Sequence, residues 1–309
     1  MTILDLTTAT ELGRVSAGSV LIASPPQIRQ GKHNEFMVGN FTTPDGTAEF
    51  KIWEERTFSV VRDKGPGIYD VEVEGSEYNG IYLTVRRIQP TSNPDWIKSD
   101  FLPTIPREQL TLLWQKVRAR LQPLGVSDQA WQLLETMLAD PQLEGRYVIE
   151  GAAIYYHDNR VGGLLNHTGK MLNILAAVLE NLPALQASAD LLFLGVALHD
   201  LGKVFEYRDL GLGEYWYANH RIRGIEFIAG YKDKIVAAYD EAFYRQLQTI
   251  IMGHHGDYGD RPTTVAAGIV HYIDTLESQT TSMLESQAES QDGRLRFGDW
   301  GWLQGIPVE

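Results

Sequence analysis

The chain has 309 residues, of which 43% are hydrophobic and 22% charged, the composition of a soluble globular protein long enough for two domains. Cysteine is absent, which excludes disulfides, cysteine-ligated zinc and a cysteine nucleophile. The formal net charge of −13 argues against broad, non-specific binding to nucleic acid, although a local binding groove is compatible with it.

The N-terminal residues 1–15 lack the basic start and the apolar middle of a signal peptide. No apolar run along the chain approaches the length that we expect of a membrane span. We therefore expect a cytoplasmic chain with no membrane partner.

Residues 15–90 are predicted to form strands, because short runs alternate between apolar and polar residues and turn signals separate them. The clearest runs are "SVLIAS", "EFMVGNF", "AEFKIWEE" and "IYDVEVEG". Asp45-Gly46 is a dipeptide typical of hairpin turns, and His33 is expected at the surface in a polar turn. About five strands in this length indicate a small β-barrel, with an OB-fold as the first candidate and a β-sandwich as the alternative.

An OB-fold binds single strands by stacking bases on exposed aromatic rings along a groove with some positive charge. Alternation sends about half of the rings into the core, and we assign Phe50 there. Residues 1–100 contain ten Lys and Arg against fourteen Asp and Glu, so binding should be modest and sensitive to salt. The candidates for base contacts are Phe41, Trp53, Tyr78 and Tyr82, and those for phosphate contacts are Arg86 and Arg87.

The domain division is predicted from changes in composition. Residues 1–95 form the barrel domain, and a proline-containing linker follows at 96–107. From 108 to 295 apolar residues recur every three or four positions, which predicts an all-helical domain. The aromatic and glycine-rich residues 296–309 form a C-terminal tail to which we assign no function. The predicted fold class is therefore multidomain α and β, a small β-barrel followed by an all-α domain.

Polar residues fall at the inner ends of several apolar helical runs in the second domain. His167 shares a helical face with Leu164 and Met171, and His199 precedes Asp200 at the end of an apolar run. A buried carboxylate needs a compensating partner, which a metal ion would supply while also explaining the clustered imidazoles. A single inward histidine is otherwise a hydrogen-bonded core residue, which is the alternative for His157 and His271. The other members of the polar set are His254, His255 and Asp274.

The order His167, His199-Asp200 and Asp274 resembles the H…HD…D pattern of the HD superfamily of metal-dependent phosphohydrolases. The segment "LHDLGK" matches the extended motif HD-x-G-K at each fixed position. The resemblance implies an all-helical domain in which these four residues bind a divalent ion and phosphate esters are hydrolysed.

The chain further resembles the YhaM-type 3′–5′ exoribonucleases, in which an OB-fold precedes an HD domain. The resemblance is carried by "GGLLNHTGKML", "HDLGKVFEY", "HHGDYG", "HYIDTLES" and the barrel hairpin "TPDGTAEFKIWEE". Ile154 and Tyr156 stand where the family tends to have a lysine and a histidine, and Ala266 where it tends to have a glutamate. These changes spare the metal ligands and affect substrate contacts, among which we count His157 as a nucleic-acid contact.

Histidine and carboxylate ligands without thiolate suit divalent manganese, iron, cobalt, nickel or zinc, and we expect one or two ions per chain, with manganese first. Asp200 has two oxygens and could bridge to a second ion. The available ligands of that second ion are His220 and either His254 or His255.

Lys203 follows His199 by four residues, so both would share one face of a continuous helix. A cation in that place neutralises a phosphate oxygen as charge builds in the transition state. The alternative is a lysine favoured by the dipole at a helix C-terminus. Gly202 is expected to admit the substrate and Gly195 a neighbouring backbone.

These residues predict a metal-dependent phosphodiesterase, a 3′–5′ exonuclease of single-stranded RNA, with DNA as a further candidate. A metal-bound hydroxide would be the nucleophile, and Asp200 and Lys203 the catalytic residues. Polarity and RNA preference follow from the resemblance alone. One alternative is an HD phosphohydrolase of mononucleotides or a small signalling nucleotide, and another is a nucleic-acid-binding regulator with a vestigial HD site. Assembly into a homo-oligomer is left open.

Overall fold

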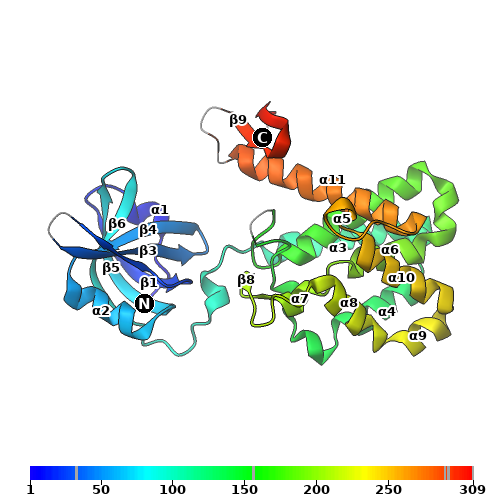
Figure 1. Ribbon diagram of the computed structural model, residues 1–309, viewed down its shortest axis with the longest axis horizontal. Coiled ribbons are helices and arrows are strands. Elements are labelled where there is room, and N and C mark those ends of the chain that lie inside the picture. The colour runs from blue at the N-terminus through cyan, green and yellow to red at the C-terminus, as the bar shows by residue number, and fades with distance from the viewer. Residues whose placement is uncertain (32–33, 155–156, 289, 291–292, 308–309) are drawn as a thin grey trace. The chain divides into compact units, whose positions relative to one another are not determined.

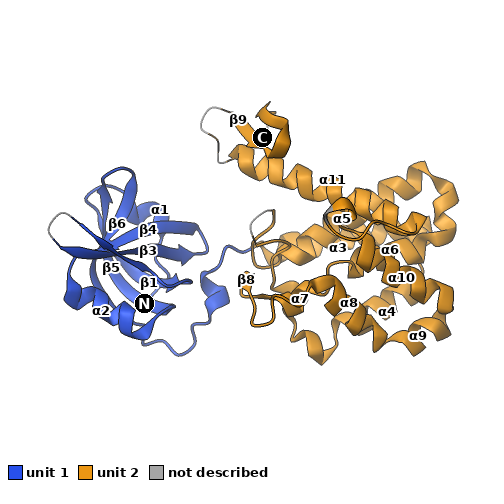
Figure 2. Cartoon of the chain, viewed as in Figure 1, with its two compact units in different colours: residues 1–104 blue, residues 105–309 orange. Residues whose placement is uncertain are grey.

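The computed structural model describes residues 1–31, 34–154, 157–288, 290 and 293–307. The chain divides into two compact units, Met1–Thr104 and Ile105–Glu309 (Figure 2). This division falls within the predicted linker at 96–107, where a short 3-10 turn buries Phe101 in the first unit. His33 and Tyr156 lie outside the described residues.

The first unit is a β-barrel with two short helices (Figure 1). Its elements are α1 (Leu6–Ala9), β1 (Val15–Ile22), β2 (Gln27–Gln30), β3 (Glu35–Thr43), β4 (Gly46–Ile52), α2 (Glu55–Lys64), β5 (Gly67–Glu77), β6 (Ile81–Pro90) and η1 (Lys98–Phe101). The strand order is β1-β5-β6-β4-β3-β2, and the pairing of β1 with β3 closes the sheet. Strands β4 and β6 run parallel and the other pairs antiparallel. This closed sheet confirms the predicted small barrel of OB-like fold.

The strands differ from the prediction in two details. The β3–β4 hairpin turns at residues 44–45, because Thr43 pairs with Gly46, one residue earlier than the Asp45-Gly46 dipeptide predicts. Gly46 has a φ of 135°, which a residue with a side chain rarely adopts. The edge strand β2 was missed because only Ile28 in its sequence "QIRQ" is apolar.

Two of the rings that were predicted to contact bases are buried in the barrel interior. Phe41 is fully buried and stacks on Phe50, with ring centroids 4.1 Å apart, so its predicted role is wrong. It lies on the same face of β3 as the buried Met37, which alternation along a strand explains. Tyr82 is also buried, and the Nζ of Lys51 lies 3.7 Å from its ring centroid, so its predicted role is wrong as well.

The other predicted barrel contacts remain at the surface. Trp53 is half-exposed and stacks on Phe36 with ring centroids 4.7 Å apart, and Tyr78 is largely exposed. Arg87 is exposed on β6. Arg86, on the same strand, forms a 2.6 Å ion pair with a glutamate of β5, so part of its charge is already neutralised.

The second unit is mainly helical and confirms the predicted α domain. Its helices are α3 (Arg107–Leu121), α4 (Asp128–Leu138), α5 (Gly163–Asn181), α6 (Ala189–Leu198), α7 (Lys203–Glu206), α8 (His220–Ala229), α9 (Lys232–Ala238), α10 (Glu241–Gly253) and α11 (Val265–Ala288). Its 3-10 turns are η2 (Gln122–Leu124), η3 (Pro141–Leu143), η4 (Arg146–Val148), η5 (Pro183–Ser188), η6 (Gly256–Tyr258) and η7 (Gly298–Trp300). Two short hairpins pair β7 (Tyr207–Arg208) with β8 (Gly211–Leu212), and β9 (Arg294–Phe297) with β10 (Gly301–Gln304). The second hairpin occupies much of the predicted tail and packs on α11.

Helix α6 lies at the centre of this unit and packs against α4, α5, α10 and α11. By length and composition alone, the segment Pro183–Glu206 around it could cross a membrane, since its most apolar window has a mean hydropathy of 1.2. Within its most apolar stretch, 67% is buried inside the protein, as expected for a core helix. The burial of α6 fixes the position of its C-terminal end, where His199 and Asp200 lie.

Candidate metal centre

The His199-Asp200 pair lies directly after α6. The helix ends one residue before His199, and Nδ1 of His199 donates to the carbonyl oxygen of Val196 at 2.8 Å. Residues 199–202 form a turn, and Lys203 begins the separate helix α7. The prediction that Lys203 and His199 share a continuous helix is therefore wrong, and so is the alternative of a lysine at a helix C-terminus.

Gly202 forms the turn after Asp200 and lies against the start of α8. A Cβ on Gly202 would lie 1.8 Å from the carbonyl oxygen of His220, so the close approach requires glycine. Gly202 therefore brings His220 toward Asp200 and does not have the predicted role of admitting substrate. At Gly195 a Cβ would lie 2.7 Å from the side chain of Ile250, so a side chain fills the space predicted for a backbone.

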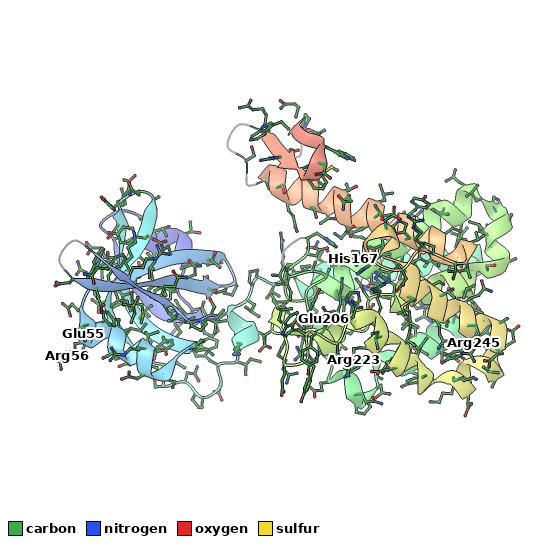
Figure 3. The ribbon with its side chains drawn as sticks, viewed as in Figure 1. Glu55, Arg56, His167, Glu206, Arg223 and Arg245 are labelled. Atoms are coloured by element: carbon green, nitrogen blue, oxygen red, sulfur yellow. The ribbon has the colours of Figure 1, made fainter. Side chains whose placement is uncertain are left out.

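The remaining histidines come from helices that pack around the end of α6. Helix α5 carries His167 in its N-terminal half, α8 begins with His220, and His254 follows the last residue of α10. Asp274 lies on α11. Helices α5, α10 and α11 pack on α6, while α8 packs on α7 and α10, so segments more than 100 residues apart meet here (Figure 3, in which His167 is labelled).

Each of these four histidines is oriented by a hydrogen bond from Nδ1. The acceptors are the Glu277 carboxylate for His167, the Val196 carbonyl for His199 at 2.8 Å, the Glu206 carboxylate for His220 at 2.6 Å and the Ile251 carbonyl for His254 at 2.8 Å. Because Nδ1 donates in every case, the neutral ring keeps its lone pair on Nε2. Metal-binding histidines are oriented in the same way.

The Nε2 atoms of all four histidines and Oδ1 of Asp200 are buried without a hydrogen-bond partner among the described residues. Buried polar atoms are almost always paired, because an unpaired one costs free energy. Imidazole and carboxylate donors that converge in this way are the ligands that divalent transition metals take. The residues therefore fit the metal that the HD resemblance implies.

A first group of ligand atoms surrounds Oδ2 of Asp200. This oxygen lies 3.3 Å from Nε2 of His199 and 3.9 Å from Nε2 of His167. Oδ1 of Asp274 lies 3.3 Å from the same His167 nitrogen. Bonds of about 2.0–2.2 Å to a shared ion place ligand atoms roughly 3–3.5 Å apart, which is close to these separations.

A second group surrounds the other oxygen of the same carboxylate. Oδ1 of Asp200 lies 3.5 Å from Nε2 of His220 and 3.4 Å from Nε2 of His254. His255 joins this group, since one ligand atom from each of the four residues lies within 4.8 Å of the others. The structure thus places both His254 and His255 at the centre, and Asp200 presents one oxygen to each group.

Burial and carboxylate partners set the protonation of the rings. Burial lowers the pKa of His254 to about 4 and that of His255 to about 3, so both are neutral at pH 7, as metal ligation requires. Burial also opposes the charged form of His167, but the nearby carboxylates of Asp274 and Glu277 outweigh it and raise the pKa to about 9. The carboxylates around His167 therefore attract positive charge to this position.

Lys203 lies inside the centre. Its Nζ contacts Oδ2 of Asp200 at 2.5 Å and donates to the carbonyl oxygen of Ala152 at 2.6 Å. Burial disfavours the charged form of both groups, but the ion pair outweighs this effect. The pKa of Asp200 is therefore held well below its ordinary value, and the pKa of Lys203 is held above its ordinary value. Lys203 is therefore an ammonium beside the carboxylate that the two ligand groups share.

Two residues of the centre were missed by the sequence analysis, Glu277 and Glu206. Glu277 binds His167 from one turn beyond Asp274 on α11. Glu206 accepts from both the backbone N–H and Nδ1 of His220, at 3.1 and 2.6 Å. Each follows a predicted site residue by three positions, which was the available signal. Both orient metal-ligand candidates, which makes them positioning residues.

Two further histidines flank the centre. His157 is buried beside His167, with ring centroids 5.0 Å apart, and burial lowers its pKa to about 4. Its contact with nucleic acid stays a prediction. His271 donates from Nδ1 to the carbonyl oxygen of His254 at 2.6 Å, which is the core role considered for it.

Comparison with known families matches residues 164–279 to the HD domain. The 3′–5′ exoribonuclease YhaM of Bacillus subtilis (strain 168) is 27% identical over 284 residues, covering 88% of each chain. The YhaM proteins of Bacillus licheniformis and Geobacillus sp. are 28% and 27% identical and cover 77% and 76% of this chain, and 76% and 73% of their own. The similarity to the YhaM of Bacillus subtilis thus extends into both units.

Proposed function

Because this chain is an HD-domain protein that resembles the YhaM-type 3′–5′ exoribonucleases, we propose that it is a metal-dependent exonuclease that removes nucleotides from the 3′ end of single-stranded RNA. Single-stranded DNA is the second substrate in this proposal. We place the enzyme in the cytoplasm, where it would meet RNA.

The observation that carries the proposal is the pair of ligand groups on one carboxylate. Asp200 presents Oδ2 to His167 and His199, and Oδ1 to His220 and His254. Two ions held by one bridging carboxylate lie about 3.5–4 Å apart in phosphodiesterases, a spacing that suits both the attacking and the leaving oxygen. A mononucleotide hydrolase would share this centre, but it would have no need of a strand-binding barrel.

We assign a role to each part of the centre. One ion would be held by His167, His199, Asp200 and Asp274, and a second by Asp200, His220, His254 and His255, with manganese as the expected metal. When bound, these ions would supply positive charge to the phosphodiester and lower the pKa of a nearby water. Lys203 holds an ammonium beside Oδ2 of Asp200, within reach of a non-bridging phosphate oxygen.

We assign binding of the single-stranded nucleic acid to the barrel. Trp53 and Tyr78 expose aromatic surface on which bases can stack, and Arg87 is an exposed cation on β6. Stacking accepts every base, so this module would bind strands without regard to sequence.

End-labelled single-stranded RNA and DNA, incubated with and without Mn²⁺, test the proposal. We expect a ladder of products that shortens from the 3′ end only when Mn²⁺ is present, and faster for RNA. Cleavage of mononucleotides alone would favour the small-nucleotide phosphohydrolase. Binding of the strand with no hydrolysis under any divalent metal would favour the regulator with a vestigial site.

Trp53→Ala tests the barrel in the full-length chain. Removing the ring should raise KM on a long single strand by at least roughly fivefold, because stacking of one base contributes about 1–3 kcal/mol. The kcat should stay unchanged, since Trp53 lies in the barrel unit and the ligand groups lie in the helical unit. Phe41→Leu, a change in the barrel core, is the matched control and should leave KM unaffected. Equal KM values for Trp53→Ala and wild type would show that the single-stranded nucleic acid binds to another surface.

A further inference from the structure

A loop rich in aromatic residues leads directly into the metal centre. It comprises residues 213–219, between β8 and α8, and is called the aromatic loop (Figure 1). Its consecutive residues Tyr215, Trp216 and Tyr217 are 53%, 53% and 70% exposed. The residue after the loop is His220, a ligand candidate of the second group.

Backbone hydrogen bonds hold the aromatic loop in place. The N–H of Ala218 donates to the carbonyl oxygen of Tyr215 at 2.9 Å, and that of Gly213 to the carbonyl oxygen of Glu206 at 2.8 Å. Asn219 caps α8 by accepting from the N–H of Arg221 at 2.9 Å. These bonds use no aromatic ring, and although the side chain of Tyr215 also interacts with Glu214, the exposed ring faces are not needed to hold the backbone of the loop.

The three rings form one cluster. The ring of Tyr217 lies 6.3 Å from those of both Tyr215 and Trp216, edge to face at 81° and 79°. Single exposed aromatic residues are common on protein surfaces, but a contiguous group marks a binding site. Every base of a nucleic acid offers a flat π-face to such a cluster.

The distance from the metal centre suits the terminal bases of a strand. Tyr217 precedes His220 by three positions, so their Cα atoms lie at most roughly 11 Å apart. Stacked nucleotides repeat about every 3.4 Å along a strand. Tyr217 therefore lies within about three nucleotides of a phosphodiester at the second ligand group.

The arginines around the aromatic loop are paired with carboxylates. Residues 207–223 contain three arginines and two acidic residues, in a chain of net charge −13. Arg223 lies one turn after His220 on α8, and its guanidinium lies 5.3 Å from the ring centroid of Phe205 (Figure 3). Each arginine also pairs with a carboxylate, Arg208 with Glu144 at 3.0 Å, Arg221 with Asp260 at 3.0 Å and Arg223 with Glu226 at 3.6 Å, so stacking rather than charge would have to supply most of the binding.

We propose that the aromatic loop is a base-binding subsite beside the metal centre, on which Tyr215, Trp216 and Tyr217 stack the bases at the 3′ end of a single strand. This subsite rests on the proposed exonuclease function. It positions the terminal phosphodiester at the ligand groups, and it recognises the presence of bases without selecting their identity.

Trp216→Ala tests the subsite through binding. The probe is a labelled single strand with hydrolysis-resistant phosphorothioate linkages at its 3′ end, and fluorescence anisotropy with Mn²⁺ gives Kd. The same strand with its last three nucleotides abasic is the second probe. We expect Trp216→Ala to raise Kd roughly tenfold or more for the strand with bases, and to leave Kd for the abasic strand unchanged. Trp216→Phe, which keeps a ring, should remain close to wild type.

Trp300→Ala is the matched control, because Trp300 is an exposed tryptophan of the C-terminal hairpin, and it should leave both Kd values unchanged. Equal Kd for Trp216→Ala and wild type on the strand with bases would overturn the subsite. Equal weakening on the abasic strand would also overturn it, by showing a structural effect on His220. A changed oligomeric state with unchanged strand binding would instead make the loop a self-association surface. Hydrolysis of an unmodified strand is scored separately, so base-dependent binding by an inactive wild type would support the subsite and reject the exonuclease.

Discussion

Asp200→Ala should lower kcat on single-stranded RNA by more than about 10³-fold, beyond the loss for removal of a single preorganised contact. The substitution removes the one carboxylate whose two oxygens face both ligand groups. Metal content, measured by elemental analysis after gel filtration, should fall together with activity. Full turnover by metal-depleted Asp200→Ala would reject the metal centre.

Stability should fall as well, because Asp200→Ala leaves Lys203 as a buried ammonium without its carboxylate partner. Breaking a buried ion pair by removing one partner costs about 3–5 kcal/mol. Thermal unfolding should therefore occur at a lower temperature, while far-UV circular dichroism at room temperature still reports a helical protein.

Glu277→Gln is a milder variant of the same centre. It keeps every ligand atom but weakens the hydrogen bond that orients His167, and metal affinity should fall by about 10–100-fold.

Lys203→Met should lower kcat by about 10²-fold at saturating Mn²⁺, the loss expected for one preorganised contact with a phosphate oxygen in the transition state. Methionine keeps much of the side-chain length and removes the charge. KM should change little if the contact forms mainly in the transition state. Steady-state kinetics on single-stranded RNA, with metal content measured on the same sample, separates loss of the contact from loss of metal.

Lys170→Met is the matched control for Lys203. Lys170 also pairs with carboxylates, Asp158 at 2.7 Å and Glu277, but it contacts Oε1 of Glu277, while Oε2 faces His167. Loss of Lys170 should lower metal affinity through His167, and the resulting loss of activity should disappear at saturating Mn²⁺. A wild-type kcat for Lys203→Met under those conditions would show that Lys203 only balances the charge of Asp200.

The ligand candidates could be found in the sequence because imidazoles and carboxylates are unusual among the apolar residues of a helix. His167, Asp200 and Asp274 were each recognisable from their apolar neighbours, and the structure brings them together. Their anchors could not be found in this way. Glu277 bonds to His167 across 110 residues, and no local pattern indicates which carboxylate will reach which ring.

The end of α6 shows a second limit of sequence reasoning. Apolar periodicity continues through Leu201 to Val204, so it predicts a helix that carries Lys203 on the same face as His199. The turn that separates them depends on Gly202 lying against the carbonyl oxygen of His220, which is a tertiary contact. In the barrel, alternation predicted that some rings are buried, but it did not identify Phe41 as one of them, because that choice depends on how the sheet closes.

Under the proposed metal binding, the Nε2 atoms around Asp200, which have no hydrogen-bond partner among the described residues, would make the survival of the folded chain depend on metal supply. An ion that binds only the folded state stabilises it by mass action, by about 2.7 kcal/mol when the free metal concentration is 100 times Kd. As metal becomes scarce this increment vanishes, while the free-energy cost of burying bare imidazoles and a carboxylate remains. The ion-free chain therefore opens more often and meets proteases more often. In a metal-starved cell the amount of this protein would be governed by its turnover as much as by its synthesis.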